Sequence, residues 1–381
     1  MKKFLIRIFL ALALSLAFYY AVDYLTVTNW SNQESLIVRV IESGPESLIP
    51  SEESEGGGED SYATYERDTV IKILSGSRSG EVLSVRTVRL AASSLRVQDG
   101  QRYLLVWDIF EDGSVQYSIA DSFRVPSVAG VVFAVCALLI ALAGYRGLLA
   151  LLGLGASIIL LVFLMIPLMT LGYDPVKIAL ASVVVISAAT TLCVIKHINY
   201  IFIAFLGSLG GAFGGFICGT LMVYLWELSG LAGEGAALLA STLPFLNMRG
   251  VLLASVLIGS IGAVLDVSVS VTASMSEFVD YDKDIPLDRL LSAGLNVGSE
   301  VLGSMINTLI LAYMGSSLPM AILISSAGVE LQGVLNDPYI AQEIVQSLAG
   351  TLGLLLTIPA TAFFFVLQES FARLKEKNKN D

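Results

Sequence analysis

Charged side chains are scarce in this sequence. Of its 381 residues only 14% are charged, whereas 55% are hydrophobic. A soluble domain carries about 25% charged residues, so this composition excludes an ordinary soluble domain. The mean hydropathy of +0.77 agrees with a chain dominated by long apolar segments. We therefore predict an α-helical polytopic membrane protein, for which the lipid bilayer is the first partner.

Histidine, cysteine and clustered basic residues are also few. The three cysteines, Cys136, Cys193 and Cys218, lie in apolar runs and lack the spacing of a disulfide framework or a zinc site. No His-Glu-x-x-His or Gly-x-Gly-Asp run occurs, so an intramembrane hydrolase is the weakest hypothesis, and we expect neither an enzyme nor a cofactor. The net charge is −11, and no basic cluster is large enough to neutralise phosphates, so nucleic acid is not an expected partner.

The first 126 residues divide into an anchor and a β-rich domain. Residues 1–29 hold an apolar run after Lys2, Lys3 and Arg7 without a clear cleavage site, which favours an uncleaved anchor over a signal peptide. Residues 30–126 are predicted to form a small all-β domain, a barrel or a sandwich, with a disordered acidic insert at 51–60. Runs rich in β-branched and aromatic residues predict strands at 36–41, 69–74, 82–88, 103–109 and 115–119.

Residues 127–368 are predicted to form a seven-helix membrane domain, which a basic tail at 369–381 follows. Each apolar run is close to the roughly 20 residues that cross a bilayer. The predicted spans are 128–143, 148–171, 176–195, 200–226, 251–275, 293–318 and 344–367. Whether 227–250 and 316–338 re-enter the membrane is left open. Most Lys and Arg near the spans lie on the side of the N-terminus, which predicts cytoplasmic termini and an extracytoplasmic β domain.

Four glycines at steps of four mark one face of the run 200–226. They are Gly207, Gly211, Gly215 and Gly219. Small residues let helix backbones approach closely in lipid, so this stripe predicts a packing seam. A sliding surface for alternating access is the alternative interpretation.

Two carboxylates lie within consecutive apolar runs, Asp266 in the first and Glu300 in the second. Ser270 shares a helical stripe with Asp266, and Asn296 and Asn307 share one with Glu300. An ionised acid in hydrocarbon costs at least a few kcal/mol (~3), so such residues are rarely kept without a use. No Lys, Arg or His lies in the middle of a span, which favours a bound Na⁺ or proton over a salt bridge. We predict that the two stripes face each other; hydrogen bonding between helices alone is the alternative.

Several segments resemble the YibE/F-like family of bacterial membrane proteins. The matching segments are GAVLDVSVS (262–270), GLNVG (294–298), GSMINTLILAY (303–313) and GSSLP (315–319), with VIKILSG (70–76) in the β domain. The resemblance implies a location in the bacterial cytoplasmic (inner) membrane without naming a substrate. The family pattern usually has a basic residue before the acid at Glu300, where this chain has Ser299. A looser similarity to the membrane half of the SecF and RND-type permeases implies that Asp266 couples to protons.

We therefore expect a membrane transporter or permease coupled to a proton or small cation. Asp266 would bind the ion, and Ser270, Asn296, Glu300 and Asn307 would act as ligands or as a relay. One alternative is a channel-like pore. Another is an accessory protein whose outer β domain binds a partner protein while its spans anchor it. The sequence leaves open the transported ion or solute, the direction of transport, and whether the chain forms a homo-oligomer.

Overall fold

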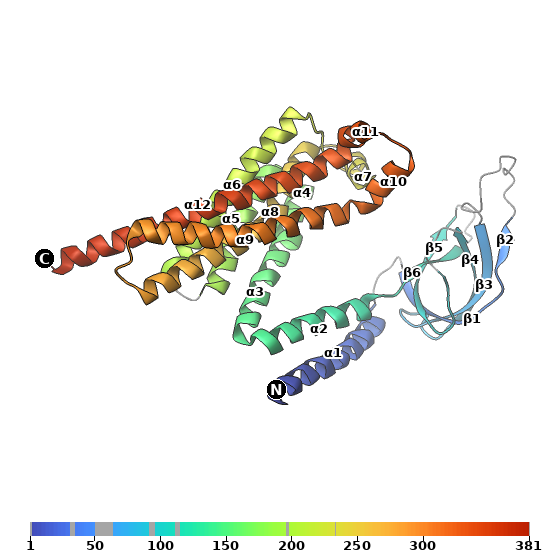
Figure 1. Cartoon of the computed structure of the whole chain (residues 1–381). Helices are drawn as coiled ribbons and strands as arrows, with labels where there is room; N and C mark the ends of the chain where they lie inside the picture. The colour runs from blue at the N-terminus through green and yellow to red at the C-terminus, as the bar shows by residue number, and fades with distance from the viewer. Residues whose placement is uncertain are drawn as a thin grey trace. The chain divides into compact units, whose positions relative to one another are not determined.

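In the computed structural model the first helix, α1 (Lys2–Asn29), is a long apolar helix that packs against α2 (Val125–Ala143). The structure describes residues 2–30, 35–49, 64–90, 96–110, 115–195, 198–232 and 234–380. Phe18 of α1 stacks on Phe133 of α2 with ring centroids 4.3 Å apart. These two helices and the β domain between them form one compact unit, Met1–Gly147, and Leu148–Asp381 forms a second (Figure 1).

The β domain is one antiparallel sheet. It consists of β1 (Ser35–Ser43), β2 (Ser47–Ile49), β3 (Thr64–Ile73), β4 (Val82–Leu90), β5 (Arg102–Ile109) and β6 (Val115–Ser122). The order is β2-β3-β1-β5-β6, and β4 pairs with β3. Because β4 also packs against β6, the sheet curls toward a barrel. All five predicted strands are present, and the short β2 is an addition; the predicted disorder at 51–60 lies outside the described residues.

The core of the sheet follows from the alternation of apolar and polar residues. Val40, Ile71, Ile73 and Leu105 are fully buried, and the residues next to them along each strand are more exposed. Glycine marks the turn after β3, where Gly76 has a φ of 77° that other residues rarely adopt. The alternating pattern therefore accounts for a separate small core.

The second unit is entirely helical in its described residues. Its helices are α3 (Tyr145–Leu160), α4 (Ile166–Thr170), α5 (Pro175–Val194), α6 (Ile198–Leu225), α7 (Glu234–Thr242), α8 (Met248–Tyr281), α9 (Leu287–Ser316), α10 (Leu318–Ser326), α11 (Leu331–Asn336) and α12 (Pro338–Asn380). A single π-helical turn, Leu161–Met165, joins α3 to α4. Helix α8 lies at the centre and packs against α5, α6, α9 and α12.

Eight helices among the described residues are long and apolar enough to cross a membrane, and they match the eight predicted spans. Three of the predicted spans were too short. Helix α8 continues to Tyr281, α9 begins at Leu287 and α12 begins at Pro338, because a helix can extend beyond its apolar run. Asp337 caps the start of α12, since its Oδ1 accepts hydrogen bonds from the Tyr339 and Ile340 amides at 2.9 and 3.2 Å.

Candidate functional site

Asp266 lies near the middle of α8, on the side of the helix that the rest of the second unit leaves open. The side chain of Asn247 begins this helix by accepting a hydrogen bond from the Gly250 amide at 3.1 Å. Val264 and Val267 are fully buried on the opposite side, whereas Asp266 is exposed. Within the part of the chain that the structure describes, Asp266 has no hydrogen-bond or ion-pair partner.

Small residues border Asp266 along the open side of α8. Gly262 precedes it by one turn, and a Cβ atom built there would meet no other atom within 4 Å. Ser270 follows by one turn and is half-buried. The carboxylate therefore has free space beside it, enough for water or a small ion, and one hydroxyl within a helical turn.

The predicted ligands on α9 also lie on an open face. Leu290, Gly294, Gly298 and Leu309 are the buried positions of this helix. Asn296, Glu300 and Asn307 are all exposed, and at 100° per residue they lie about half a turn from the buried face. Helix α9 is thus amphipathic, with an apolar face toward α8 and α12 and a polar face pointing away from them.

The register between α8 and α9 follows from two close approaches. Gly294 lies against the Met275 side chain, and the Tyr313 hydroxyl lies against Gly259, so the helices run antiparallel. By this register Asp266 is level with Ser304 and Met305, between Glu300 and Asn307.

The sequence predicts that the two polar stripes face each other, but within one chain they do not, because Asp266 and the polar residues of α9 are all exposed. The α8–α9 contact includes Gly294 against Met275 and Gly259 against Tyr313, and Leu309 of α9 packs against Gly350 of α12. The apolar residues at helical spacing determine which face of α9 packs against its neighbours, so the polar stripe lies outside the contact. The role of these residues in ion binding stays a prediction.

A polar cluster that sequence reasoning missed lies where α8, α9 and α12 meet. The Gln346 side chain donates a hydrogen bond to the Ser255 hydroxyl at 3.3 Å. Glu343 is within electrostatic range of Tyr313, and its Oε2 is buried without a hydrogen-bond partner among the described residues. Glu343 fell one residue outside the predicted span 344–367. The sequence signal that could have revealed Glu343 is its spacing of three residues from Gln346, which puts both side chains on one face of α12.

A family model, YibE/F-like protein, matches residues 131–369. The chain belongs to the YibE/F-like family. No curated protein and no solved structure matches it. The family match covers α3 to α8, all of α9, and most of α12, so it contains Asp266 and every predicted ligand. It begins within α2, so the resembling segment of the β domain, residues 70–76, lies outside it. The similarity to SecF and RND-type permeases stays a prediction.

Buried hydroxyls join the helices of this YibE/F-like protein at other places. Ser187 of α5 and Ser208 of α6 form a hydrogen bond. The Ser268 hydroxyl donates to the Ala204 carbonyl at 2.7 Å and pairs with the Thr361 hydroxyl at 3.0 Å. Because these groups are satisfied inside the bundle, they stabilise helix contacts and are not free to bind an ion.

The glycine stripe of α6 lies against α12, which is the longest helix contact in the family domain. Gly211 is adjacent to the Thr357 side chain and the Gly353 carbonyl, and Gly215 is adjacent to the Ala349 carbonyl. Gly207 and Gly219 continue the stripe, next to Thr361 and next to Ala349 and Val256 respectively. A side chain at Gly211 or Gly215 would meet the backbone of α12, and one at Gly207 or Gly219 would meet its side chains, so the stripe sets the distance between the two helices.

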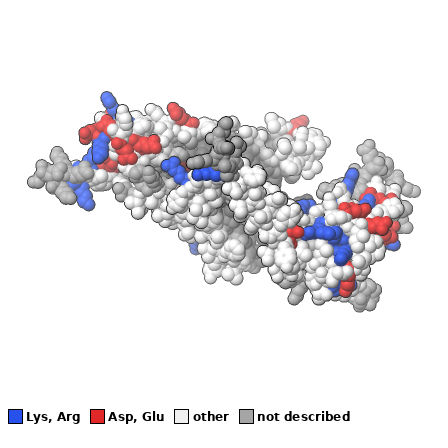
Figure 2. All heavy atoms as spheres, turned by 90° about the horizontal axis from the view of Figure 1, so that it is seen from below, with Lys and Arg blue, Asp and Glu red and all other residues white. Residues whose placement is uncertain are grey.

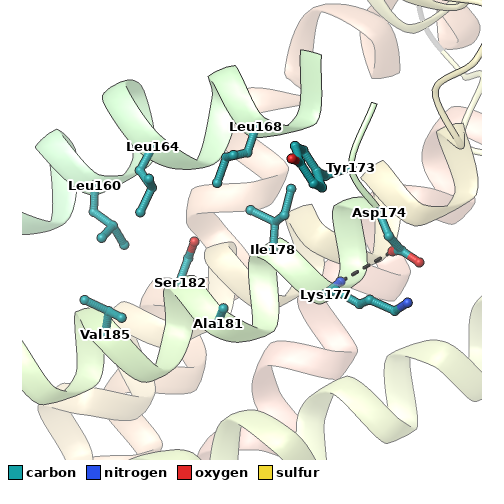
Figure 3. A pocket seen from close by; sticks show the side chains of 10 residues that line it. All are labelled: Leu160, Leu164, Leu168, Tyr173, Asp174, Lys177, Ile178, Ala181, Ser182 and Val185. Carbon is teal, nitrogen blue, oxygen red and sulfur yellow. Dashed lines mark hydrogen bonds between the residues drawn. The ribbon is translucent and has the colours of Figure 1, made fainter. Parts of the chain in front are cut away.

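A cavity of about 250 Å³ lies between α5 and the helix that leads into it (Figure 3). Leu160, Leu164 and Leu168 line one wall, and residues of α5 line the other. The Asp174 carboxylate at its edge accepts a hydrogen bond from the Val176 amide at 2.9 Å and so caps α5. Since its one carboxylate is engaged and its walls are apolar, this cavity suits a hydrocarbon chain better than an ion.

Proposed function

We propose that this YibE/F-like protein is a multi-pass membrane transporter that couples to a proton or a small cation at Asp266. The observation that supports the proposal is an unpaired carboxylate near the middle of the most buried of the eight spans. Asp266 lies about 27 Å from Met248 and about 22 Å from Tyr281 along α8, at 1.5 Å per residue. With a hydrocarbon layer of about 30 Å, these lengths favour a carboxylate near the midplane.

A carboxylate at this depth favours two states. An ionised acid without a partner is costly in hydrocarbon, so the group either takes up a proton or holds a cation. Arginine and lysine do not supply a counter-charge, because the sequence has none in the middle of a span. The open space at Gly262 and the hydroxyl of Ser270 would accommodate a small hydrated ion.

The charged residues at one end of the second unit support an orientation of that unit in the membrane. Figure 2 shows Asp and Glu side chains gathered with Lys and Arg at that end, next to a long stretch with few charges. The charged residues at this end of α8, in the loop after it, at the start of α9 and near the end of α12 are Glu277, Asp280, Asp282, Lys283, Asp284, Asp288, Arg289, Arg373 and Lys375. We place this end in the cytoplasm by the rule that Lys and Arg stay inside. The bacterial inner membrane is the location that the family suggests.

A carbodiimide tests the site without knowledge of the substrate, because it modifies protonated carboxyls in apolar surroundings. In native membranes we expect the hydrophobic reagent dicyclohexylcarbodiimide to modify Asp266, with less modification as the pH rises. Protection by NaCl but not by choline chloride would identify Na⁺ as the ion. Glu277, on the same side of α8 beyond the apolar stretch, is the internal control and should stay unmodified. Equal modification of both residues, or none at Asp266, would refute the site.

Transport is tested with Asp266→Asn in proteoliposomes that contain a pH-sensitive dye. Under an imposed Na⁺ or proton gradient we expect the flux of Asp266→Asn to be about tenfold lower than that of the native protein, whereas Glu277→Gln keeps the native flux. Full flux in Asp266→Asn at equal protein level would contradict the proposal. Flux that never exceeds passive equilibration would favour the channel-like pore. Absence of flux with both proteins would favour an accessory protein with a partner at the β domain.

A further inference from the structure

Two of the eight spans have few buried residues, and they differ sharply in polarity. In an apolar 18-residue stretch of Tyr145–Thr170, and in one of Leu287–Ser316, only 6% of the residues are buried. The first has a mean hydropathy of 2.8, the highest of the eight, and the second has 1.3, the lowest. Lipid tails suit the exposed surface of the first span but not that of the second.

The polarity of α9 comes from one face, which we call the α9 polar face. It consists of Asn296, Ser299, Glu300, Gly303, Ser304, Asn307 and Thr308, all exposed. Ser299 and Thr308 satisfy their hydroxyls within the helix, donating to the Leu295 and Ser304 carbonyls at 2.8 and 2.9 Å. The side chains of Asn296, Glu300 and Asn307 have no such partner among the described residues. These three therefore need hydrogen-bonding groups from outside the second unit.

The other uncovered spans of this chain are poor sources of such groups. The spans Arg7–Asn29 and Val125–Ala143 are each 11% buried, with mean hydropathies of 1.8 and 2.6. Their exposed side chains are mainly aliphatic or aromatic, among them Leu12, Leu16, Val131 and Val135. Aliphatic surface does not satisfy an amide or a carboxyl. A second α9 polar face does, because an asparagine amide both donates and accepts.

We propose that the α9 polar face is the contact between two copies of this chain. A two-fold axis along the membrane normal would set the two α9 helices parallel, so that equivalent residues meet at equal depth. Asn296 would pair with Asn296 of the second copy, and Asn307 with Asn307, by reciprocal amide hydrogen bonds.

Glycine and glutamate in the same face fit this contact. A Cβ built at Gly303 meets nothing within 4 Å, so this glycine leaves room for the backbone of the second copy to approach. The two Glu300 carboxyls would lie close enough to share a proton. The contact needs only that α9 spans the membrane, and so does not depend on ion coupling at Asp266.

Cysteine cross-linking in native membranes tests the contact. The background is a full-length variant with Cys136, Cys193 and Cys218 replaced by alanine, into which Gly303→Cys or Asn307→Cys is introduced. The matched control is Ile217→Cys, an exposed position within the apolar span of α6. Under mild oxidation we expect most of the Gly303→Cys protein to form a disulfide-linked dimer and the control to stay monomeric.

Co-expression of two differently tagged copies identifies what is cross-linked. Recovery of both tags in one product supports the second copy. Monomer at both test positions, dimer of equal yield in the control, or a product of other mass would overturn the proposal.

Substitution of the amides gives an independent measurement. We expect Asn296→Leu combined with Asn307→Leu to weaken dimerisation in mild detergent by about tenfold, because both reciprocal hydrogen-bond pairs are lost. Ser304→Ala is the control, since this hydroxyl donates to the Val301 carbonyl of its own helix at 3.0 Å. Dimerisation by the double variant equal to that of the native protein would contradict the contact.

Discussion

The α6–α12 contact makes a strong prediction about stability, because Gly211 leaves no room for a side chain. A Cβ at Gly211 would overlap the Thr357 hydroxyl oxygen, its nearest neighbour, and would lie 2.8 Å from the Gly353 carbonyl oxygen and 2.9 Å from the Thr357 Cβ. Atoms at such distances must move, and a backbone carbonyl inside a helix moves only with the helix. We therefore expect Gly211→Ala to push α6 and α12 apart along a seam that also contains Gly207, Gly215 and Gly219.

The size of the effect follows from what an added methyl group does in a packed interior. Overpacking of this kind costs about 1–3 kcal/mol. The usual gain from replacing a helical glycine by alanine, about 0.5–1 kcal/mol, offsets part of it. We expect Gly211→Ala to lower the free energy of unfolding by about 1–2 kcal/mol. Gly155→Ala on α3 is the matched control, because a Cβ there meets nothing within 4 Å.

The assay is thermal unfolding of the purified protein in one detergent, with the helical bundle followed by circular dichroism. Thr357→Ala in the Gly211→Ala background should restore part of the loss, since it removes the Thr357 hydroxyl, which is the nearest obstruction, while the Cβ of residue 357 and the Gly353 carbonyl remain. An unfolding temperature of Gly211→Ala equal to that of Gly155→Ala would refute the reasoning.

Two further predictions concern the β domain. Ile71→Ala should destabilise that domain by about 2–5 kcal/mol, because Ile71 is fully buried in its core, and limited proteolysis should then cleave the domain while the helical unit stays intact. The Arg124 guanidinium, hydrogen-bonded to Asp121 at 2.6 Å, lowers the pKa of the Asp121 carboxyl. The ion pair of Arg124 with Asp121 therefore stabilises the fold above the unfolded pKa of Asp121, and this stabilisation is lost as the pH falls through the lowered folded pKa. Arg124→Gln should raise the pKa of Asp121 in a carboxyl-carbon NMR titration. An unchanged pKa would show that Arg124 does not lower it.

Much of the fold could be predicted because its signals are local. Apolar runs of about 20 residues predict the spans, and alternating apolar residues predict the strands. The three-residue strand β2 was missed, since so short a run carries no pattern. Helix ends were missed where polar residues continue a helix beyond the apolar run, as at Tyr281.

The candidate site could be predicted only in part. The depth of Asp266 relative to Glu300 and Asn307 follows from counting residues along two antiparallel helices. The direction in which those side chains point depends on which face of α9 packs, and Gly294, Gly298 and Leu309 decide that through contacts distant in sequence. The cluster of Glu343 and Gln346 depends in the same way on α12 meeting α8 and α9.

The π-helical turn at Leu161–Met165 has a consequence for the helix on either side of it. Such a turn amounts to one residue inserted into an α-helix, and it lies just before Pro167, which has no amide hydrogen to donate. The wider turn keeps Leu160, Leu164 and Leu168 along the same wall of the cavity. In a regular α-helix, eight residues at about 100° each would place Leu168 about 80° around the axis from Leu160. The wider turn takes up part of that rotation, so this insertion keeps two helical segments aligned as a single surface.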